Sequence, residues 1–266
     1  MGTSAPDTIT MQPERLTVGS LFTGIGGFDL GLEWAGLSIQ WMCERDQQRR
    51  TWLQQNWPHV EIANDVRGFE PPYADVICGG FPCQDISEAN PNAEGLHGAR
   101  SGLWFEMLRI IRRLRPRYAV VENVPALRFP GRGLGTLLGG LAEIGYDAEW
   151  ESLQACQFGL PHKRERIFIV AYPAERRRVQ SPVFGRAIPE ALLEKQASRS
   201  RWRLRDFRAG RGRVFQAPEH AFVELPDGLS GGLAEIAAFG DTVIPQIAEY
   251  IGTCLLHHAA RDARAF

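Results

Sequence analysis

Short apolar segments alternate with longer amphipathic ones between residues 16 and 172. This alternation is typical of β-α-β units built around a largely parallel sheet. Helical spacing of apolar residues from 103 to 114 predicts a helix that Pro116 stops, and a second helix is expected over 134–144 with Gly145 as its C-cap. Buried strands are expected at four apolar or β-branched segments, which are 17–22, 74–78, 118–121 and 167–171.

The regular alternation fails after residue 172, where arginine, proline and glycine interrupt the chain. It returns near Ile236, and we expect 243–256 to form a closing helix that packs against the main sheet. The sequence therefore predicts an α/β protein with a mostly parallel central sheet. Its expected parts are a flexible N-terminal tail (1–15), a main domain (16–172), a small second domain (173–234) and a segment returning to the main domain (235–266).

The composition is that of an ordinary soluble globular protein, with 44% hydrophobic and 23% charged residues. The apolar runs are too short for a membrane-spanning helix, and the N-terminal residues lack the basic and apolar regions of a secretion signal. The five cysteines have neither disulfide nor zinc-site spacing and suit a reducing compartment. His257 and His258 are interpreted as a frayed helix end. We expect a cytoplasmic protein without a metal ion.

Charge is distributed unevenly along the chain, although the formal net charge is only −1. Residues 173–234 contain 12 basic and 7 acidic side chains, whereas the remainder contains 18 basic and 24 acidic ones. Such a concentration of positive charge favours binding to a polyanion.

A glycine-rich turn, 22–27, follows the first expected strand and precedes a helix. Such turns let the backbone approach a ligand closely. The turn lacks the dinucleotide fingerprint G-x-G-x-x-G, because Asp29 stands three positions after Gly26, and this weakens a nicotinamide or flavin interpretation. Glu44 and Asp65, after the next two apolar runs, are placed to accept from ribose hydroxyls and an adenine amino group. Alternatively, the glycines form only a tight turn and the acids are solvated.

A second candidate site, 79–84, also directly follows an expected strand. Open α/β sheets bind ligands at the carboxyl ends of their strands, so the thiol of Cys83 would face the cleft. Pro82 fixes the backbone beside that thiol. A lone cysteine is more often a small buried hydrophobe, and we expect that of the other four cysteines.

Charged residues mark the ends of two further strands. Glu122 ends a strongly apolar strand, where partial desolvation suits a carboxyl group to proton donation or hydrogen bonding. Arg164 and Arg166 alternate with Lys163 and Glu165, so both guanidiniums would point to one side and could hold a carbonyl oxygen or a phosphate. A solvated strand end and a solvated charge run are the alternatives.

In this order and spacing, the sites resemble the DNA cytosine-5 methyltransferase family. The resemblance covers nearly the whole chain outside residues 173–234. The motifs that carry it are the cofactor loop Phe22-x-Gly24-x-Gly26-Gly27, the nucleophile motif Pro82-Cys83-Gln84, the base-binding Glu122-Asn123-Val124, the arginine motif from Gln157 to Arg166, and the closing motif from Gly240 to Gln246.

The resemblance implies a Rossmann-like S-adenosylmethionine-dependent methyltransferase fold, with 16–172 as the catalytic and cofactor-binding domain and 173–234 as a small target-recognition domain. The expected reaction is methyl transfer from S-adenosyl-L-methionine to carbon 5 of a cytosine flipped out of a specific DNA sequence, through a covalent bond to Cys83. Glu122 would hydrogen-bond or protonate ring nitrogen 3, and Arg166, supported by Arg164, would hold the exocyclic oxygen.

The resemblance also implies which residues contact each ligand. The expected cofactor contacts are Phe22, Gly24, Ile25, Gly26, Gly27, Glu44, Arg45, Asp65, Val66, Pro82, Asp241, Thr242 and Val243. The expected DNA contacts are Gln84, Ser87, Arg100 and Ser101 in a closing loop, and Arg199, Arg201, Arg203, Arg205, Arg208, Arg211 and Arg213 in the recognition region.

The expected partner is double-stranded DNA, bound by a monomer in the cytoplasm and associated with the nucleoid of a bacterial cell or phage-infected host, as in restriction-modification systems.

Two positions depart from the family pattern. Asp241 replaces the usual Asn and would repel the cofactor carboxylate unless it is protonated or turned toward the cofactor ammonium group. His162 replaces a frequent Gln. A transfer-RNA cytosine methyltransferase with the same core and a catalytically silent nucleic-acid-binding homologue are the alternatives. The failed glycine fingerprint argues against an NAD-dependent dehydrogenase.

Overall fold

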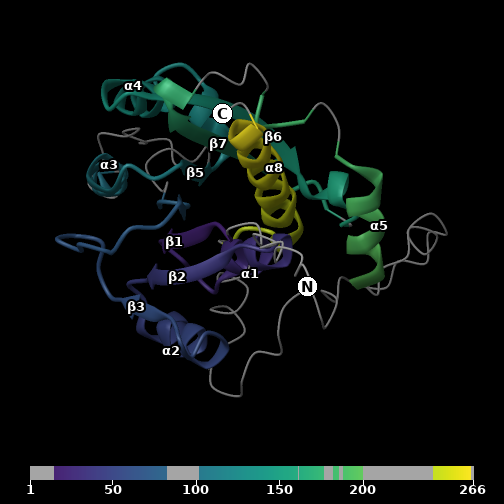
Figure 1. Cartoon of the computed structure of the whole chain (residues 1–266). Coiled ribbons are helices and arrows are strands. Elements are labelled where there is room, and N and C mark those ends of the chain that lie inside the picture. Colours follow the sequence, from purple (N-terminus) through teal and green to yellow (C-terminus); the bar gives the residue numbers. More distant parts are fainter. Residues whose placement is uncertain are drawn as a thin grey trace, which may run out of the picture.

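A computed structural model of the chain describes residues 15–82, 102–160, 162–176, 182–185, 188–199 and 242–264. Seven described strands form one sheet in the order β3-β2-β1-β4-β5-β7-β6 (Figure 1). The strands are β1 (Thr17–Leu21), β2 (Ser38–Cys43), β3 (Glu61–Ala63), β4 (Val76–Gly79), β5 (Tyr118–Asn123), β6 (Tyr146–Gln154) and β7 (Glu165–Pro173).

The described helices cover both faces of this sheet, which makes a three-layer α/β structure. One hydrophobic cluster joins the sheet to α1, α2 and α8, and a second cluster joins its other face to α3 and α4. The helices are α1 (Gly27–Ala35), α2 (Gln47–Asn56), α3 (Leu103–Leu114), α4 (Leu134–Glu143), α5 (Glu190–Arg199) and α8 (Pro245–Arg264). Within the described residues, no helix has the length and apolar composition needed to cross a bilayer.

The strand directions confirm a mostly parallel sheet. β1 pairs in parallel with β2 and β4, and the parallel pairing continues to β3 on one side and β5 on the other. β7 runs antiparallel to both of its neighbours, β5 and β6. The chain leaves β1 toward β2 and later returns to β1's other side as β4, so a topological switch point lies between β1 and β4, where open sheets form a ligand crevice.

Most of the predicted elements are present, with shifted ends. The expected strands correspond to β1, β4, β5 and β7, and the two expected central helices to α3 and α4. The closing helix begins at Pro245 and continues to Arg264, beyond the predicted end at residue 256. β6 was not predicted, because its polar residues give this edge strand no buried apolar pattern. The proposed second domain, 173–234, lies largely outside the described residues, so the domain division stays a prediction.

Two interpretations of single residues are wrong. His258 is buried inside α8 rather than at a frayed end, and its Nδ1 lies 2.8 Å from the Tyr118 hydroxyl of β5. Cys156 is exposed, although we expected it to be buried like Cys43, Cys78 and Cys254.

α1 and α8 pack so closely that glycines are required between them (Figure 1). A Cβ on Gly31 would lie 2.2 Å from the carbonyl oxygen of Pro245 and 2.5 Å from Cβ of Ala248. A Cβ on Gly252 of α8 would lie 2.7 Å from Cβ of Ala35 in α1. This contact fixes the position of α8 and of the residues that precede it.

The variant Gly31→Ala is expected to lower the free energy of unfolding by about 1–3 kcal/mol, because its methyl group overlaps backbone atoms that cannot move independently. The matched control is Gly139→Ala in α4, where a Cβ would meet no atom within 4 Å. That control should raise stability by up to about 1 kcal/mol through helix propensity. Urea unfolding measures both, and equal stability of the two variants would contradict the close packing.

Candidate active site

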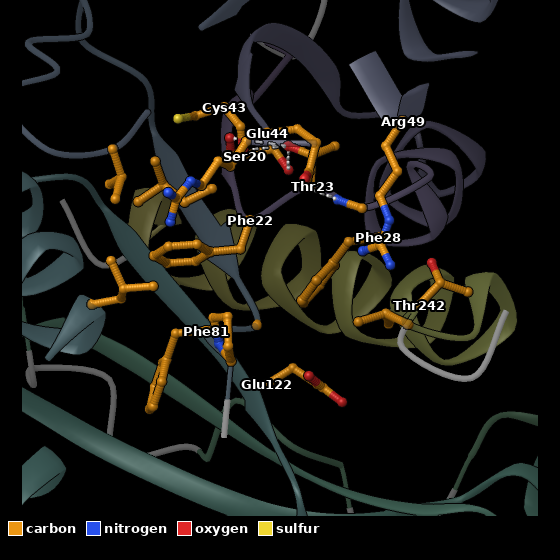
Figure 2. A pocket seen from close by; sticks show the side chains of 18 of the residues that line it. Ser20, Phe22, Thr23, Phe28, Cys43, Glu44, Arg49, Phe81, Glu122 and Thr242 are labelled. Carbon is orange, nitrogen blue, oxygen red and sulfur yellow. Dashed lines mark hydrogen bonds between the residues drawn. The ribbon is translucent and has the colours of Figure 1, made fainter. Parts of the chain in front are cut away.

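A pocket with a volume of about 510 Å³ lies at the carboxyl ends of the parallel strands (Figure 2). Its walls come from segments that are far apart in the sequence but meet at the switch point of the sheet. From the strands, they are 20–24 at and after the end of β1, 43–45 at and after the end of β2, 65–67 after β3, 80–82 after β4, 122–124 at the end of β5, and Arg166 of β7. From the helices, they are Phe28 of α1, Arg49 of α2, Leu103 of α3, and 242–243 before α8.

Glu44 is a buried carboxylate that the backbone holds in place. Its Oε2 accepts a hydrogen bond from the Gly24 amide at 2.7 Å, and its Oε1 accepts from the Asp46 amide at 2.8 Å. Each carboxylate oxygen can accept a second hydrogen bond. Glu44 can therefore bind a pair of adjacent hydroxyl groups, as in a ribose.

Asp65 lies on the same wall, beyond the end of β3. Its Oδ1 accepts from the Arg67 amide at 2.9 Å, and its Oδ2 lies 3.7 Å from Nη1 of Arg67. Glu44 and Asp65 thus place two acceptors along one side of the pocket, which suits the hydroxyl and amino donors of a nucleoside.

Phe22 has a backbone φ of 54°, in the left-handed region that non-glycine residues seldom adopt. Such conformations are held by the surrounding structure and are concentrated at ligand sites. Phe22 lines the pocket, and its ring is among the side chains drawn in Figure 2.

The glycines of the turn after β1 have different surroundings. Gly24 lines the pocket. Gly26 and Gly27 lie behind its wall, because a Cβ on Gly26 would be 2.6 Å from Trp57, and one on Gly27 would be 2.1 Å from the carbonyl oxygen of Val243. Ile25 is also outside the lining. Close packing within the protein therefore requires Gly26 and Gly27 and so shapes the wall of the pocket.

Glu122 and Arg166 form an ion pair in the pocket, with 3.0 Å between Oε1 and Nε. Glu122 is the penultimate residue of β5, and Arg166 lies near the start of the antiparallel β7. Because β7 runs antiparallel to β5, its first residues lie beside the last residues of β5. Gly80 leaves room for the acid, since a Cβ there would lie 2.5 Å from Oε2 of Glu122.

Arg164 is not part of the described lining of the pocket. It lies one residue before β7, where its carbonyl oxygen accepts from the Ala155 amide at 2.9 Å and its own amide lies 3.4 Å from Nδ1 of His162. The described lining of the pocket therefore includes Arg166 but not Arg164, and the supporting role expected of Arg164 stays a prediction.

The sequence profile of the C-5 cytosine-specific DNA methylase family matches residues 16–210. The chain belongs to this family.

Curated members of the family align with the same part of the chain. Type II methyltransferase M2.BsuMI of Bacillus subtilis (strain 168) is 37% identical over 163 residues, which are 59% of this chain and 42% of that protein. M.HpaII of Haemophilus parainfluenzae is 36% identical over 175 residues, which are 63% of this chain and 49% of that protein. M.Sau3AI of Staphylococcus aureus is 31% identical over 207 residues, which are 68% of this chain and 48% of that protein. The chain spans about half the length of the curated relatives it matches.

Two solved structures share the fold of this methylase family member. A DNA modification methyltransferase encoded within an E. coli prophage superimposes with a TM-score of 0.52 and 25% identity, covering 60% of this chain and 47% of that one. A mutant of DNMT2 from Spodoptera frugiperda superimposes with a TM-score of 0.51 and 20% identity, covering 65% of this chain and 54% of that one. This second likeness shows the fold alone. The α/β methyltransferase fold predicted from the sequence is therefore confirmed.

The pocket contains most of the described residues that we expected to touch the cofactor or the base. Its lining includes Phe22, Gly24, Glu44, Arg45, Asp65, Val66, Pro82, Glu122, Arg166, Thr242 and Val243. The predicted residues that lie outside the described part of the chain are Cys83, Gln84, Ser87, Arg100, Ser101, Asp241, the side chain of Arg199, and Arg201, Arg203, Arg205, Arg208, Arg211 and Arg213. No group of three or more side chains that could hold a metal ion occurs among the described residues.

Sequence reasoning missed Arg49, which reaches the pocket from α2. A signal was present, because Asp46 is an N-cap residue and its Oδ1 accepts from the Arg49 amide at 2.9 Å. The cap places Arg49 in the first turn of a helix that starts at the carboxyl end of β2. Residues in such first turns face the ligand crevice of open sheets.

Asp29 is a second residue that the sequence did not single out. It is completely buried in α1, and desolvation raises the pKa of its carboxyl from 3.8 to about 7, although the Ser20 hydroxyl opposes this shift. Ser20 lines the pocket, so the buried carboxyl lies directly behind the pocket wall. Folding therefore favours the protonated form of Asp29.

The pKa of Asp29 predicts how stability depends on pH. Below pH 3.8, both the folded and the unfolded chain keep this proton, whereas between pH 3.8 and about 7 only the folded chain does. The free energy of unfolding should therefore decrease by about 4 kcal/mol across this range because of this one group.

The variant Asp29→Asn has no carboxyl to titrate here, so its free energy of unfolding should not show this decrease. Relative to the parent, its free energy of unfolding should therefore rise as the pH increases from 4 to 8. Urea unfolding across this range measures the difference, and Glu61→Gln, at an exposed carboxyl, is the control. A difference between Asp29→Asn and the parent that does not vary with pH would contradict the raised pKa.

Proposed function

We propose that this chain is a DNA (cytosine-5)-methyltransferase, which transfers a methyl group from S-adenosyl-L-methionine to carbon 5 of a cytosine flipped out of double-stranded DNA. The observation that carries the proposal is one pocket in which a nucleoside-type acceptor, Glu44, and the Glu122–Arg166 ion pair are both present. The first suits the cofactor, and the second suits a pyrimidine ring with adjacent donor and acceptor atoms.

The pocket residues fit the cofactor. Glu44 would bind the ribose hydroxyls, Asp65 the adenine amino group, and Phe22 the adenine ring. The Thr242 hydroxyl is buried at the same pocket and has no hydrogen-bond partner among the described residues, which supports a polar ligand there. When bound, S-adenosyl-L-methionine would supply an electrophilic methyl group.

The chain's own residues would activate the cytosine. Carbon 5 is a poor nucleophile until a thiolate adds to carbon 6, and Cys83 directly follows Pro82, which lines the pocket. As the sulfur–carbon 6 bond forms, negative charge builds on ring nitrogen 3 and the exocyclic oxygen. Glu122 would share a proton with nitrogen 3, and Arg166 would donate to the oxygen, which stabilises that charge.

The covalent bond to Cys83 must be temporary. Once carbon 5 carries the methyl group, it loses its proton to a base, and the electron pair of that carbon–hydrogen bond re-forms the ring double bond. The sulfur–carbon 6 bond breaks in the same elimination, so Cys83 is released as a thiolate.

The target-recognition role of 173–234 rests on its charge and on how α5 is attached. The excess of basic residues in this segment suits phosphate contacts, to which the predicted arginines would contribute. α5 is fixed to α8 by Lys195 and Gln196, with 2.9 Å from Nζ to Oε1 of Glu249 and 2.8 Å from Nε2 to the Gln246 carbonyl oxygen. α5 ends where the arginine-rich segment begins, so that segment would start from a fixed point. We further propose a monomer acting at the bacterial or phage-infected nucleoid in a restriction-modification system.

Purified protein is expected to transfer labelled methyl groups from the cofactor to double-stranded DNA rather than to transfer RNA. Bisulfite sequencing of DNA from cells that express the protein would then reveal the modified site. The variant Cys83→Ser should lose at least about 1,000-fold in turnover but should bind the cofactor normally in calorimetry.

DNA with 5-fluorocytosine in the target site should become irreversibly attached to the parent protein, because elimination needs loss of a proton from carbon 5. Near-normal turnover of Cys83→Ser, or no attachment to the fluorinated DNA, would remove the covalent mechanism. Methylation of transfer RNA alone would replace the proposed substrate.

Gly80→Ala tests the placement of Glu122. The added methyl group would lie 2.5 Å from Oε2 and should displace the carboxyl group, which would lower turnover by about 100-fold. Cofactor affinity should change little, because Glu44 and Asp65 lie after other strands. Gly139→Ala is the control for adding a methyl group far from the pocket. Unchanged turnover in Gly80→Ala would argue that the base does not depend on Glu122.

A further inference from the structure

We propose that Arg128 is a positioning residue for methyl transfer, which acts by holding the first residues of β7 so that Arg166 stays paired with Glu122. The inference rests on the proposed function and adds to it a side chain that the sequence motifs do not include. Arg128 ends the 3-10 helix η2 (Pro125–Arg128), which begins two residues after the end of β5. It is not part of the described lining of the pocket, so its effect would pass through another residue.

The start of β7 extends beyond the end of β5. The paired register of these two strands ends at Asn123 and Ile167, so Glu165 and Arg166 come before the first β7 residue that pairs with β5. On its other side, β6 pairs with both of these residues. The contact on the β5 side comes from η2, which packs against β7. The position of the Arg166 segment therefore depends on what η2 contributes.

Arg128 makes a contact between η2 and both neighbouring strands with one nitrogen of its guanidinium group. Its Nη1 donates to Oγ of Ser152 in β6 at 2.8 Å and to Oε1 of Glu165 at 2.9 Å. This nitrogen carries two hydrogens, so both are used and the side chain is fixed. Oε2 of Glu165 accepts from Nε2 of Gln154 in β6 at 3.4 Å. The Glu165 carboxylate is thus held from η2 and from β6.

Two ion pairs join the end of β5 to the start of β7 on opposite faces of the sheet. Glu165 and Arg166 are consecutive residues of a strand, so their side chains project to opposite faces. Glu165 shares its face with Ile167, which packs in the cluster of α3 and α4, and there it pairs with Arg128. On the other face, Arg166 pairs with Glu122. Arg128 therefore supports the start of β7 from behind the pocket.

The direction of the Arg166 guanidinium depends on the backbone that Arg128 holds. Nη1 of Arg166 donates to the Glu165 carbonyl oxygen at 2.8 Å, while Nε lies 3.0 Å from Oε1 of Glu122. Rotation of the Glu165 peptide would move the guanidinium away from Glu122 and from a cytosine oxygen bound beside it. Such shifts matter for the rate, because a displacement of about 1 Å can slow a reaction about 100-fold.

The contact is better suited to orienting the site than to stabilising the fold. The side chains of Arg128 and Glu165 are 38% and 23% exposed. Ion pairs with this exposure contribute little to stability, because water screens them. Loss of Arg128 is therefore expected to change the rate of the reaction more than the free energy of unfolding, which distinguishes a positioning residue from a structural one.

Single-turnover methylation of DNA that carries the modified site tests this role, together with calorimetry and DNA-binding measurements. Arg128→Met should lower the rate of methyl transfer about 10-fold and leave the affinities for S-adenosylhomocysteine and DNA unchanged. Arg128→Lys should recover most of the rate, because an ammonium group can donate to Ser152 and Glu165 together. The control Arg112→Met removes an exposed arginine of α3 and should change none of these quantities.

A double-mutant cycle shows whether Arg128 acts through Glu165. Glu165→Met removes the other partner of the contact and should lower the rate to a similar extent. The protein with both changes should be about as slow as Arg128→Met, rather than about 100-fold slower than the parent, because the two changes remove the same contact.

Three outcomes with an active parent protein would overturn this role alone. The first is an unchanged rate in Arg128→Met, or rate losses that multiply in the protein with both changes. The second is a lower DNA affinity with a weaker salt dependence, which would assign Arg128 to a phosphate contact. The third is an equal loss of rate, S-adenosylhomocysteine affinity and thermal stability, which would make it a structural residue. Absence of methyl transfer to DNA by the parent protein would instead reject the proposed function, and this inference with it.

Discussion

The close contact between α1 and α8 determines the shape of the pocket. Gly27 and Gly31 let backbone atoms of Val243 and Pro245 approach to distances that any side chain would prevent. At the other end of α8, His258 is fixed by the Tyr118 hydroxyl of β5. α8 is thus held at both ends. Thr242 and Val243, a few residues before its start at Pro245, complete a pocket whose other walls lie more than seventy positions earlier in the chain.

The polar groups of the pocket are fixed by backbone amides and by charge pairing, so little reorganisation is needed when ligands bind. Two amides hold the Glu44 carboxylate, and the Arg166 guanidinium pairs with Glu122. Asp29 behaves differently, because it is buried behind the wall and folding favours its protonated form. Preorganised groups such as Glu44, Glu122 and Arg166 are those that can stabilise developing charge in a transition state.

Helix α8 also links the pocket to α5, which leads into the basic part of the chain. Glu249 is completely buried in α8 and accepts from Lys195 and Gln196 of α5. The segment that follows α5 contains the arginines proposed to meet DNA. α5 and the Thr242 wall of the pocket are therefore both attached to α8, which would connect the proposed DNA-contacting segment physically to the pocket.

The sequence by itself determined four of the seven described strands, the central helices and the glycine turn, because these follow from local periodicity and from residues with restricted or unusual backbone freedom. It also placed Glu44, Asp65 and Glu122 at strand ends, where a parallel sheet collects ligand-binding groups. Only the tertiary structure decided that β7 runs antiparallel to β5, which brings Arg166 to Glu122 in the pocket. It also decided that Arg49 reaches the pocket and that Gly26 and Gly27 contact protein atoms. These features depend on contacts between segments distant in sequence, and local patterns carry no information about such contacts.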